Sequence, residues 1–307
     1  MLALRPLTAV DVRPLERFAQ RQWPLSFHPG GLGWQLATGD FSHDNATLAH
    51  RGGDIVAWVA TQEPNVLYPR SQITLHGSSG DPEAGAALLE HALAEVGDAA
   101  VDLLVLEGDD GLRSLATGTG FTVAEENVFG EWMWRSATEE RIVLPEGYRI
   151  RPVGPGEETA RVECHRTAWK PSDLPWPERV GPVDPALTSR FGRERYDATR
   201  AALLYDRELD LVVEGPDGAL VACCVVWWDS ENRCSEIEPL GVVPAHRRKG
   251  LAVALVLRAC ALTARRGGDR VYINTSPGEA YPAPARTYAT AGFAPVARGT
   301  VYTLPAR

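Results

Sequence analysis

The clearest pattern of hydrophobic and polar positions lies in the second half of the chain. Two apolar runs, Leu209–Glu214 and Ala219–Trp228, flank the turn Gly215–Gly218, and a third run covers Glu236–Val242. Short apolar runs bounded by turn residues are typical of β-strands. Their close spacing predicts an antiparallel meander.

Longer stretches with helical spacing surround this meander. Helices are expected at Glu157–Trp169, within Ala186–Leu203, at Arg248–Arg265 and at Ala283–Ala291; further strands are expected at Tyr148–Pro152, at Arg270–Asn274 and, one or two, within Phe293–Leu304. The order combines a meander with a β-α-β crossover. It predicts an α/β (α+β) fold, a mixed and mostly antiparallel sheet flanked by helices.

The chain contains a loose internal repeat. The stretch from Leu2 to Trp23 resembles that from Tyr148 to Trp169, since each has an Arg-Pro strand end, a turn and a helix. Two further stretches, which start at Leu115 and Tyr288, both run from a helix end through Gly-Phe into a strand. Such self-similarity predicts two copies of one domain. We expect domains at 1–137 and 148–307, joined by a linker at 138–147.

Composition restricts the classes of function. The 307 residues carry a formal net charge of -9, which argues against general affinity for nucleic acid. The five cysteines form no Cys-x-x-Cys pair, so we expect free thiols, a reducing compartment and no metal site. The first residues lack the apolar core of a signal peptide, and no apolar stretch is long enough for a membrane span. A cytoplasmic protein is expected.

One basic cluster stands out in this acidic chain. His246, Arg247, Arg248 and Lys249 lie between the strand end Val242-Val243-Pro244 and Gly250, where a helix begins. The first N–H groups of a helix have no partner within the helix, and the helix dipole favours an anion there. The pattern is neither a Walker loop nor a Gly-x-Gly-x-x-Gly motif. It predicts a diphosphate site.

These residues resemble the acetyl-CoA site of the GCN5-related N-acetyltransferases (GNAT). The family's Arg/Gln-x-x-Gly-x-Gly/Ala motif corresponds to Arg247–Ala252, and a second motif corresponds to Tyr288–Phe293. The resemblance covers Tyr148–Leu304 well and the first half only weakly. It implies a tandem member of the family with a degenerate N-terminal copy.

The resemblance also implies roles for individual residues. The pantetheine arm of the donor would bind along backbone groups of Leu240 and Val242, and Tyr288 would protonate the leaving thiolate. Asn274, which ends the next strand, could contact the donor or only terminate the strand. The diphosphate would lie on the loop that holds Arg247, Arg248, Lys249, Gly250, Leu251 and Ala252.

A base must remove the proton of an attacking ammonium, and a carboxylate can do so through water. Glu236 and Glu238 lie two residues apart on one predicted strand and so share a face. Glu236 is the first choice as base, and Glu238 is the alternative or a substrate contact. Trp169 and Trp227 are expected to line the acceptor pocket, although tryptophans are more often packing residues.

The first copy lacks these parts. Asp81 and Glu83 stand where a phosphate would bind, and Ala116 takes the position of Tyr288. We therefore expect a degenerate domain that packs against the active one.

The predicted function is acetyl-CoA-dependent N-acetylation of the primary amine of a small molecule. Acetyl-CoA is the expected donor substrate, with no metal, no nucleic acid and no membrane partner, and a monomer is favoured over a homodimer. Mycothiol synthases and aminoglycoside acetyltransferases are narrower alternatives within the family. The alternative that is not an enzyme is a non-catalytic acyl-CoA-binding module.

Overall fold

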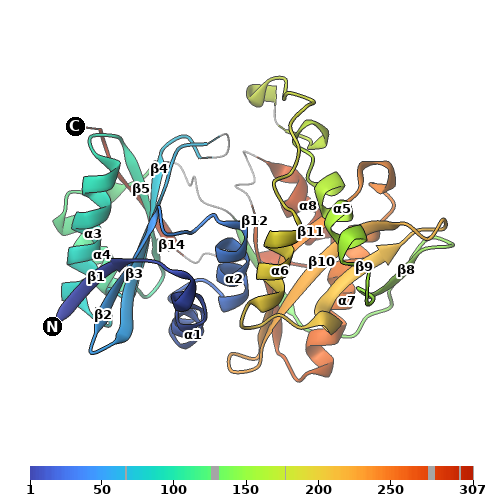
Figure 1. The fold of residues 1–307 in the computed structure, drawn as a ribbon, viewed down its shortest axis with the longest axis horizontal. Coiled ribbons are helices and arrows are strands. Elements are labelled where there is room, and N and C mark those ends of the chain that lie inside the picture. The colour runs from blue at the N-terminus through green and yellow to red at the C-terminus, as the bar shows by residue number, and fades with distance from the viewer. Residues whose placement is uncertain (66–67, 126–130, 177, 276–280, 297–298, 307) are drawn as a thin grey trace. The chain divides into compact units, whose positions relative to one another are not determined.

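The computed structural model describes residues 1–307 except 66–67, 126–130, 177, 276–280, 297–298 and 307, and except the side chains of Glu131 and Arg179 (Figure 1). The chain divides into two compact units. Unit 1 consists of residues 1–130 and 297–307, and unit 2 consists of residues 131–296. Over the described residues, each unit contains one sheet of seven strands.

Unit 1 has its strands in the order β1-β2-β3-β4-β5-β14-β6. The strands are β1 (Leu2–Pro6), β2 (Ala46–Arg51), β3 (Asp54–Gln62), β4 (Ser71–His76), β5 (Val101–Leu106), β6 (Thr122–Val123) and β14 (Gly299–Leu304); the helices are α1 (Val12–Gln22), α2 (Pro29–Thr38), α3 (Pro82–Val96) and α4 (Asp110–Gly118). Apolar side chains of α3 and α4 cover one face, and those of α1 and α2 cover the other.

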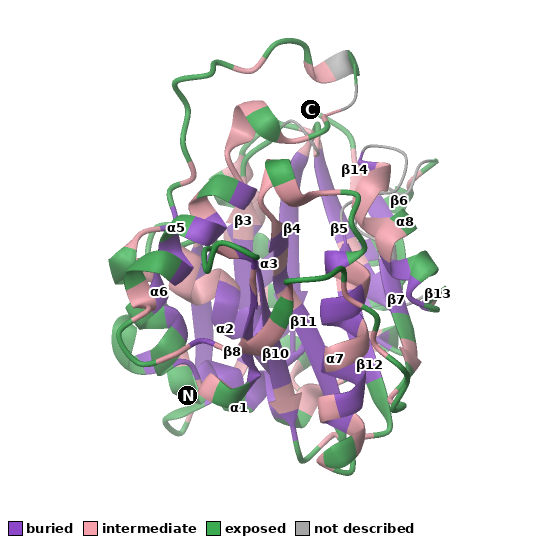
Figure 2. Ribbon diagram, turned by 90° about the vertical axis from the view of Figure 1, so that its right-hand side faces the viewer, coloured by how far each residue is buried: buried purple, intermediate pink, exposed green. Residues whose placement is uncertain are grey.

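Unit 2 repeats this plan with the order β8-β9-β10-β11-β12-β7-β13. The strands are β7 (Glu131–Ser136), β8 (Arg149–Pro152), β9 (Asp210–Glu214), β10 (Leu220–Asp229), β11 (Cys234–Val242), β12 (Arg270–Thr275) and β13 (Ala294–Pro295); the helices are α5 (Glu158–Ala168), α6 (Arg193–Ala201), α7 (Leu251–Arg265) and α8 (Pro282–Thr290). Helices α7 and α8 bury their apolar residues on one face, and α5 packs on the other. Figure 2 shows that the buried residues follow the strands and the inner sides of the helices.

The strand pairing confirms a mixed, mostly antiparallel sheet. Only β4 with β5 and β11 with β12 pair in parallel among the strand pairs of the described residues. The meander β9-β10-β11 is antiparallel throughout. The sequence therefore predicted the fold class correctly.

The predicted domain limits do not coincide with the compact units. Strand β7, assigned to the first domain, pairs along six residues with β12 of unit 2. Strand β14, assigned to the second domain, pairs along six residues with β5 of unit 1. Each half thus contributes one strand to the sheet of the other. Burial of apolar side chains stabilises this exchange, since Met133 on β7 and Tyr302 on β14 lie in the cores of the sheets that they join.

One predicted helix is shorter than expected. Helix α7 begins at Leu251 rather than Arg248, because Arg248 and Gly250 have left-handed backbone angles with φ of 63° and 78°. Helix α6 (Arg193–Ala201) lies within the stretch Ala186–Leu203, where a helix was predicted. Of the preceding 169–192, the described residues form only the short 3₁₀ turns Pro171–Asp173 and Glu178–Val180.

Candidate acyl-transfer site

The site begins where strands β11 and β12 separate. The parallel pairing links only Cys234–Glu236 with Arg270–Tyr272, although β11 continues to Val242. The N–H of Val243 donates to Val221 on β10 at 2.9 Å. Because successive strand residues direct their backbone groups to alternate sides, the N–H groups of Leu240 and Val242 face away from β10, toward the open edge.

A bulge in β11 marks the point of separation. The register with β10 shifts between Cys224 and Val226, so that one residue of β10 opposes two of β11 around Glu238. The indole N–H of Trp227 donates to the carbonyl of Glu238 at 2.5 Å. Trp227 is fully buried and contacts Tyr205 at a ring distance of 6.4 Å. The predicted role of Trp227 in lining a substrate pocket therefore does not fit, because its ring has no exposed surface; it packs and holds the bulge.

The loop before α7 has the geometry expected of an anion site. Pro244–His246 form a short 3₁₀ turn, and Gly250 is the N-cap residue of α7. A Cβ on Gly250 would meet nothing within 4 Å, so the glycine is needed for its positive φ rather than for space. Backbone N–H groups in alternating conformations, followed by a helix N-terminus, form a concave site that favours a phosphate group.

The side chains of the basic cluster are engaged in different ways. Arg247 donates from Nε to Val242 O at 3.1 Å, from Nη2 to Ala168 O at 3.1 Å, and from Nη1 to Asp173 O. Lys249 Nζ donates to the hydroxyl of Tyr148 at 2.9 Å. Three backbone carbonyls thus already bind the guanidinium of Arg247. To contact the diphosphate as predicted, the side chain would have to give up some of these hydrogen bonds.

Tyr288 lies on α8, and its side chain is 8% exposed. Burial raises the pKa of its phenol well above the ordinary value, and the carboxylates of Glu238 and Glu236 raise it further. Tyr288 belongs to the core that α7 and α8 cover, so the predicted acid is a buried phenol.

Glu236 and Glu238 differ in exposure. Glu236 is buried, whereas Glu238 is intermediate. Glu236 pairs with Trp227 across β10 and β11, and paired residues of antiparallel strands point to the same face of a sheet. Since Ile237 packs in the core beneath α7, Glu236 lies on the opposite face, on which α5 packs.

The remaining predicted residues lie around the open end of β11. Trp169 follows α5 directly, and a Cβ placed on Gly241 would lie 2.8 Å from its Nε1 atom. Asn274 is near the end of β12, and its buried Oδ1 atom has no hydrogen-bond partner among the described residues. An unpaired buried amide oxygen is available to a donor group of a ligand.

A family model described as "Acetyltransferase (GNAT) family" matches residues 173–293. This span contains the open strand edge, the anion loop and Tyr288. The chain contains a GNAT acetyltransferase domain.

The chain also resembles other proteins along most of its length. It is 29% identical over 285 residues to a mycothiol acetyltransferase of Kineococcus radiotolerans, which covers 84% of this chain and 85% of the relative. A GCN5-related N-acetyltransferase structure from Sphaerobacter thermophilus superimposes with a TM-score of 0.53 at 18% identity, covering 99% of this chain and 95% of that chain. A tandem GNAT protein from the clavulanic acid biosynthesis pathway gives 0.55 at 16% identity, with coverages of 99% and 98%. The two structures show that the fold is shared.

The sheets allow the candidate site to be compared with the corresponding positions of unit 1. Ile73 on β4 and Ile237 on β11 both face the long helix of their unit, so the residues before them, Gln72 and Glu236, correspond. By the same register Thr74 corresponds to Glu238. The β3-β4 pairing of unit 1 also has no register shift. Unit 1 therefore lacks both carboxylates and the bulge, a difference that sequence comparison did not reveal.

The anion position of unit 1 is also occupied by its own side chains. Asp81 caps α3 by accepting from Ala84 N at 3.1 Å, and Arg51 Nε binds the same carboxylate at 2.7 Å. Arg51 lowers the pKa of Asp81, which keeps the carboxylate charged. A bound phosphate would have to displace this carboxylate.

Sequence reasoning missed Tyr281, which precedes α8. Its ring lies 5.5 Å from that of Trp176, and Tyr281 is 8% exposed. The two are separated by over 100 positions, so no local pattern could reveal the contact.

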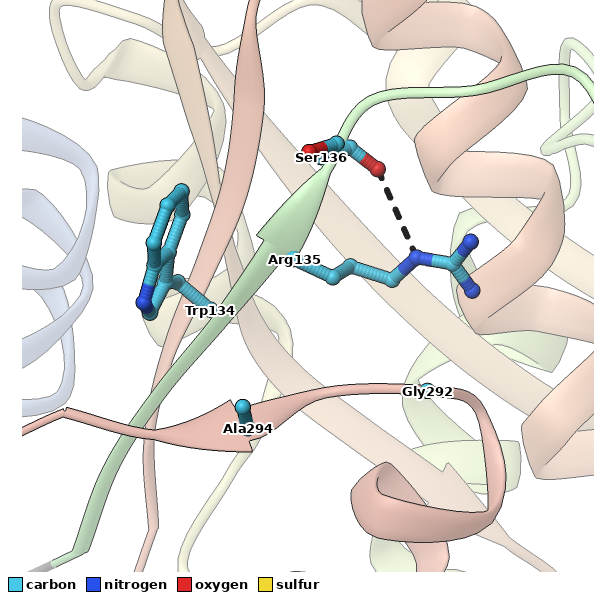
Figure 3. A pocket seen from close by; sticks show the side chains of 5 residues that line it. All are labelled: Trp134, Arg135, Ser136, Gly292 and Ala294. Atoms are coloured by element: carbon cyan, nitrogen blue, oxygen red, sulfur yellow. Dashed lines mark hydrogen bonds between the residues drawn. The ribbon is translucent and has the colours of Figure 1, made fainter.

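A shallow pocket lies elsewhere in unit 2. It is lined by Trp134, Arg135, Ser136, Gly292 and Ala294, and Figure 3 shows Trp134 and Arg135 extending from opposite sides of β7. The guanidinium of Arg135 donates to Ala291 O, Thr138 Oγ1 and Glu140 Oε1, so its charge is already neutralised. None of the predicted site residues lines this pocket.

No helix of the described residues is long and apolar enough to cross a membrane. No group of three or more His, Cys, Asp or Glu side chains that could hold a metal ion occurs in the part of the chain that the structure describes.

Proposed function

We propose that unit 2 is an acetyl-CoA-dependent N-acetyltransferase that acts on the primary amine of a small molecule. The observation that carries the proposal is the end of the β11-β12 pairing at Glu236, with Glu238 further along β11 and the buried Tyr288 on α8 as candidate groups for proton transfer. An open strand edge and an anion-binding helix start lie on the same strand-loop-helix segment. Together they supply a place for the donor and two groups for proton transfer.

The donor would bind mainly through backbone groups. The N–H groups of Leu240 and Val242 would pair with the amides of the pantetheine arm, as an added strand does. The diphosphate would bind N–H groups of Arg248–Ala252, and Asn274 would offer its free amide oxygen. The exposed Arg248 and Lys249 would add positive charge.

The acid must hold its proton until the thiolate leaves. The raised pKa of Tyr288 keeps the phenol protonated throughout the neutral range, and the hydroxyl can then donate its proton to the sulfur. The amine attacks the thioester directly, the carbon–sulfur bond breaks, and no acyl-enzyme is required.

The base would be Glu236, with Glu238 as the alternative. Glu236 lies on the face of the sheet opposite α7, so an amine that approaches from the α5 side would meet its carboxylate. Removal of the ammonium proton, directly or through water, makes the nitrogen nucleophilic. Glu238 lies beside the bulge and would contact a cationic acceptor.

Within the class of small amines, the substrate of the mycothiol acetyltransferases is the more specific candidate for the acceptor. The relative from Kineococcus radiotolerans matches along 84% of the chain rather than over one domain. This match favours a mycothiol precursor over an aminoglycoside as the acceptor, and the aminoglycosides are the alternative. We propose further that unit 1 is a degenerate copy without acyltransfer activity, and that the protein is a cytoplasmic monomer.

The test is thiol release from acetyl-CoA with a panel of amines that includes the mycothiol precursor and aminoglycosides. Tyr288→Phe and Glu236→Gln should each lower kcat by about 10²–10⁴-fold, because each removes one proton-transfer group. Trp134→Phe, a change in the pocket outside the site, is the control and should keep kcat. Tight acetyl-CoA binding without turnover of any amine would instead support a non-catalytic acyl-CoA-binding module.

A further inference from the structure

The guanidinium of Arg247 joins three separate elements. It binds the carbonyl of Val242 at the end of β11, that of Ala168 at the end of α5, and that of Asp173 in the turn that follows. The carbonyl end of a helix carries partial negative charge, which favours a cation at Ala168. A planar group with donors on several sides can make these three contacts at once.

The segment held in this way is residues 168–176, which we call the strap. At its far end the indole N–H of Trp176 donates to Pro171 O at 2.8 Å, and the ring packs against Tyr281. Tyr281 directly precedes α8, the helix that carries Tyr288. Burial raises the pKa of Tyr281, and the positive charge of Arg247 opposes that rise.

The strap borders the face of β11 that presents Glu236. Ala168 and Trp169 press against Gly241, where a Cβ would lie 3.0 Å and 2.8 Å from their nearest side-chain atoms. Gly241 pairs with Cys223, whose side chain is buried beneath α5, and Glu236 lies on that same face. The strap therefore runs beside the surface where an amine would meet the proposed base.

We propose that Arg247 is a positioning residue for the acceptor side of the site and not a ligand of the donor diphosphate. This inference rests on the proposed function. The diphosphate would bind the backbone N–H groups that follow Arg247 and so fix the position of the loop. Because the guanidinium of Arg247 binds the strap, the position of the loop would fix that of the strap as well. Donor binding would then set the wall of the acceptor site.

Two substitutions at one position separate the two roles. A lysine remains a good phosphate ligand but cannot span three carbonyls. If Arg247 positions the strap, then Arg247→Met and Arg247→Lys should both raise hydrogen exchange in peptides covering 169–176 by about tenfold. Both should leave the Kd for CoA, measured by calorimetry, within about threefold of the wild type.

Two further variants complete the experiment. Trp176→Ala should loosen the same peptides and keep CoA affinity, because it releases the other end of the strap. Arg265→Met removes an exposed arginine on α7 and should change neither readout. With the best amine of the panel, Arg247→Met should raise the KM for the amine by about tenfold with the KM for acetyl-CoA retained.

The opposite pattern would overturn the proposal. If Arg247→Met weakens CoA binding by about tenfold or more, if Arg247→Lys restores it, and if exchange at 169–176 is unchanged, Arg247 is a diphosphate ligand. A wild-type protein that binds no CoA would refute the proposed function itself, and this inference with it. If both Arg247 variants keep the wild-type Kd for CoA and the wild-type hydrogen exchange at 169–176, this inference is refuted and the proposed function is not.

Discussion

At the scale of single residues, Trp227 shows how a buried side chain can shape a site without touching a ligand. Its indole N–H binds the carbonyl of Glu238 at the bulge that opens the sheet. A buried carbonyl that loses its donor costs about 1–3 kcal/mol. Trp227 was expected to line the acceptor pocket, but in the structure it is buried and holds the backbone of Glu238.

Trp227→Phe should lower both stability and kcat. Trp58 is an internal control, because it is also fully buried but its Nε1 atom has no hydrogen-bond partner among the described residues. Both changes lose packing, so the difference between them isolates the hydrogen bond. We expect Trp227→Phe to reduce the free energy of unfolding by about 1–2 kcal/mol more than Trp58→Phe in urea titrations. Equal losses would show that the hydrogen bond contributes nothing.

Two glycines near the site should respond differently to alanine. At Gly250 the cost is backbone strain of about 1 kcal/mol at positive φ, and the surroundings are open. At Gly241 the new methyl group would collide with Trp169 and Ala168, for about 1–3 kcal/mol of overpacking. Thermal unfolding should therefore show the larger loss for Gly241→Ala, and calorimetry should show the larger loss of CoA affinity for Gly250→Ala. The reverse ranking in both assays would contradict these assignments.

The residues of the site were predictable to different degrees. The anion loop is local in sequence, so the order of Pro244, Gly250 and Ala252 indicated it directly. Two of the three carbonyl partners of Arg247 lie 74 and 79 positions away in the sequence, and no rule of spacing predicts such contacts. The correspondence of Gln72 with Glu236 also needed the sheet register, because the segments around them share no motif.

At the scale of elements, an ion pair fixes strand β1 to the turn that leads into α1. Arg5 binds Asp11 through two N–H groups, and Thr8 donates to the same carboxylate from its backbone and its hydroxyl. Hydrogen bonds from Arg5 and Thr8 lower the pKa of Asp11 to about 2. Its ordinary value is about 3.9, so folding stabilises the charged form.

This shift gives the ion pair a defined pH dependence. The stabilisation by Asp11 is complete above about pH 4 and is lost as the pH falls toward 2, because the unfolded state then binds the proton first. Asp11→Asn should cost about 1–2 kcal/mol at pH 7, with the half-exposed Arg5 reducing the effect. Thermal unfolding from pH 7 to pH 3 should show the gap to the wild type narrowing below pH 4. The exposed Asp44→Asn is the control and should show no gap; a gap for Asp11→Asn that is as large at pH 3 as at pH 7 would contradict the assignment.

At the scale of the whole molecule, the exchange of β7 and β14 decides which pieces can fold. The alternating residues of 293–304 predicted strands correctly in kind, but alternation carries no information about which sheet a strand joins. Strand β13 remains in unit 2, whereas β14 inserts between β5 and β6 of unit 1. The repeat in the sequence therefore identified two similar units but could not locate the limits between them.

Two fragments of nearly equal length test this exchange. Residues 131–296 contain every described strand of the second sheet, whereas residues 148–307 lack β7, which pairs with both β12 and β13. Without β7, β12 has an open edge, β13 has no described neighbour, and the place of Met133 in the core is empty. We expect 131–296 to unfold cooperatively on heating and to bind CoA, and 148–307 to lack a cooperative transition. If 148–307 folds and 131–296 does not, the repeat boundary read from the sequence is the physical one, and the strand exchange does not contribute to stability.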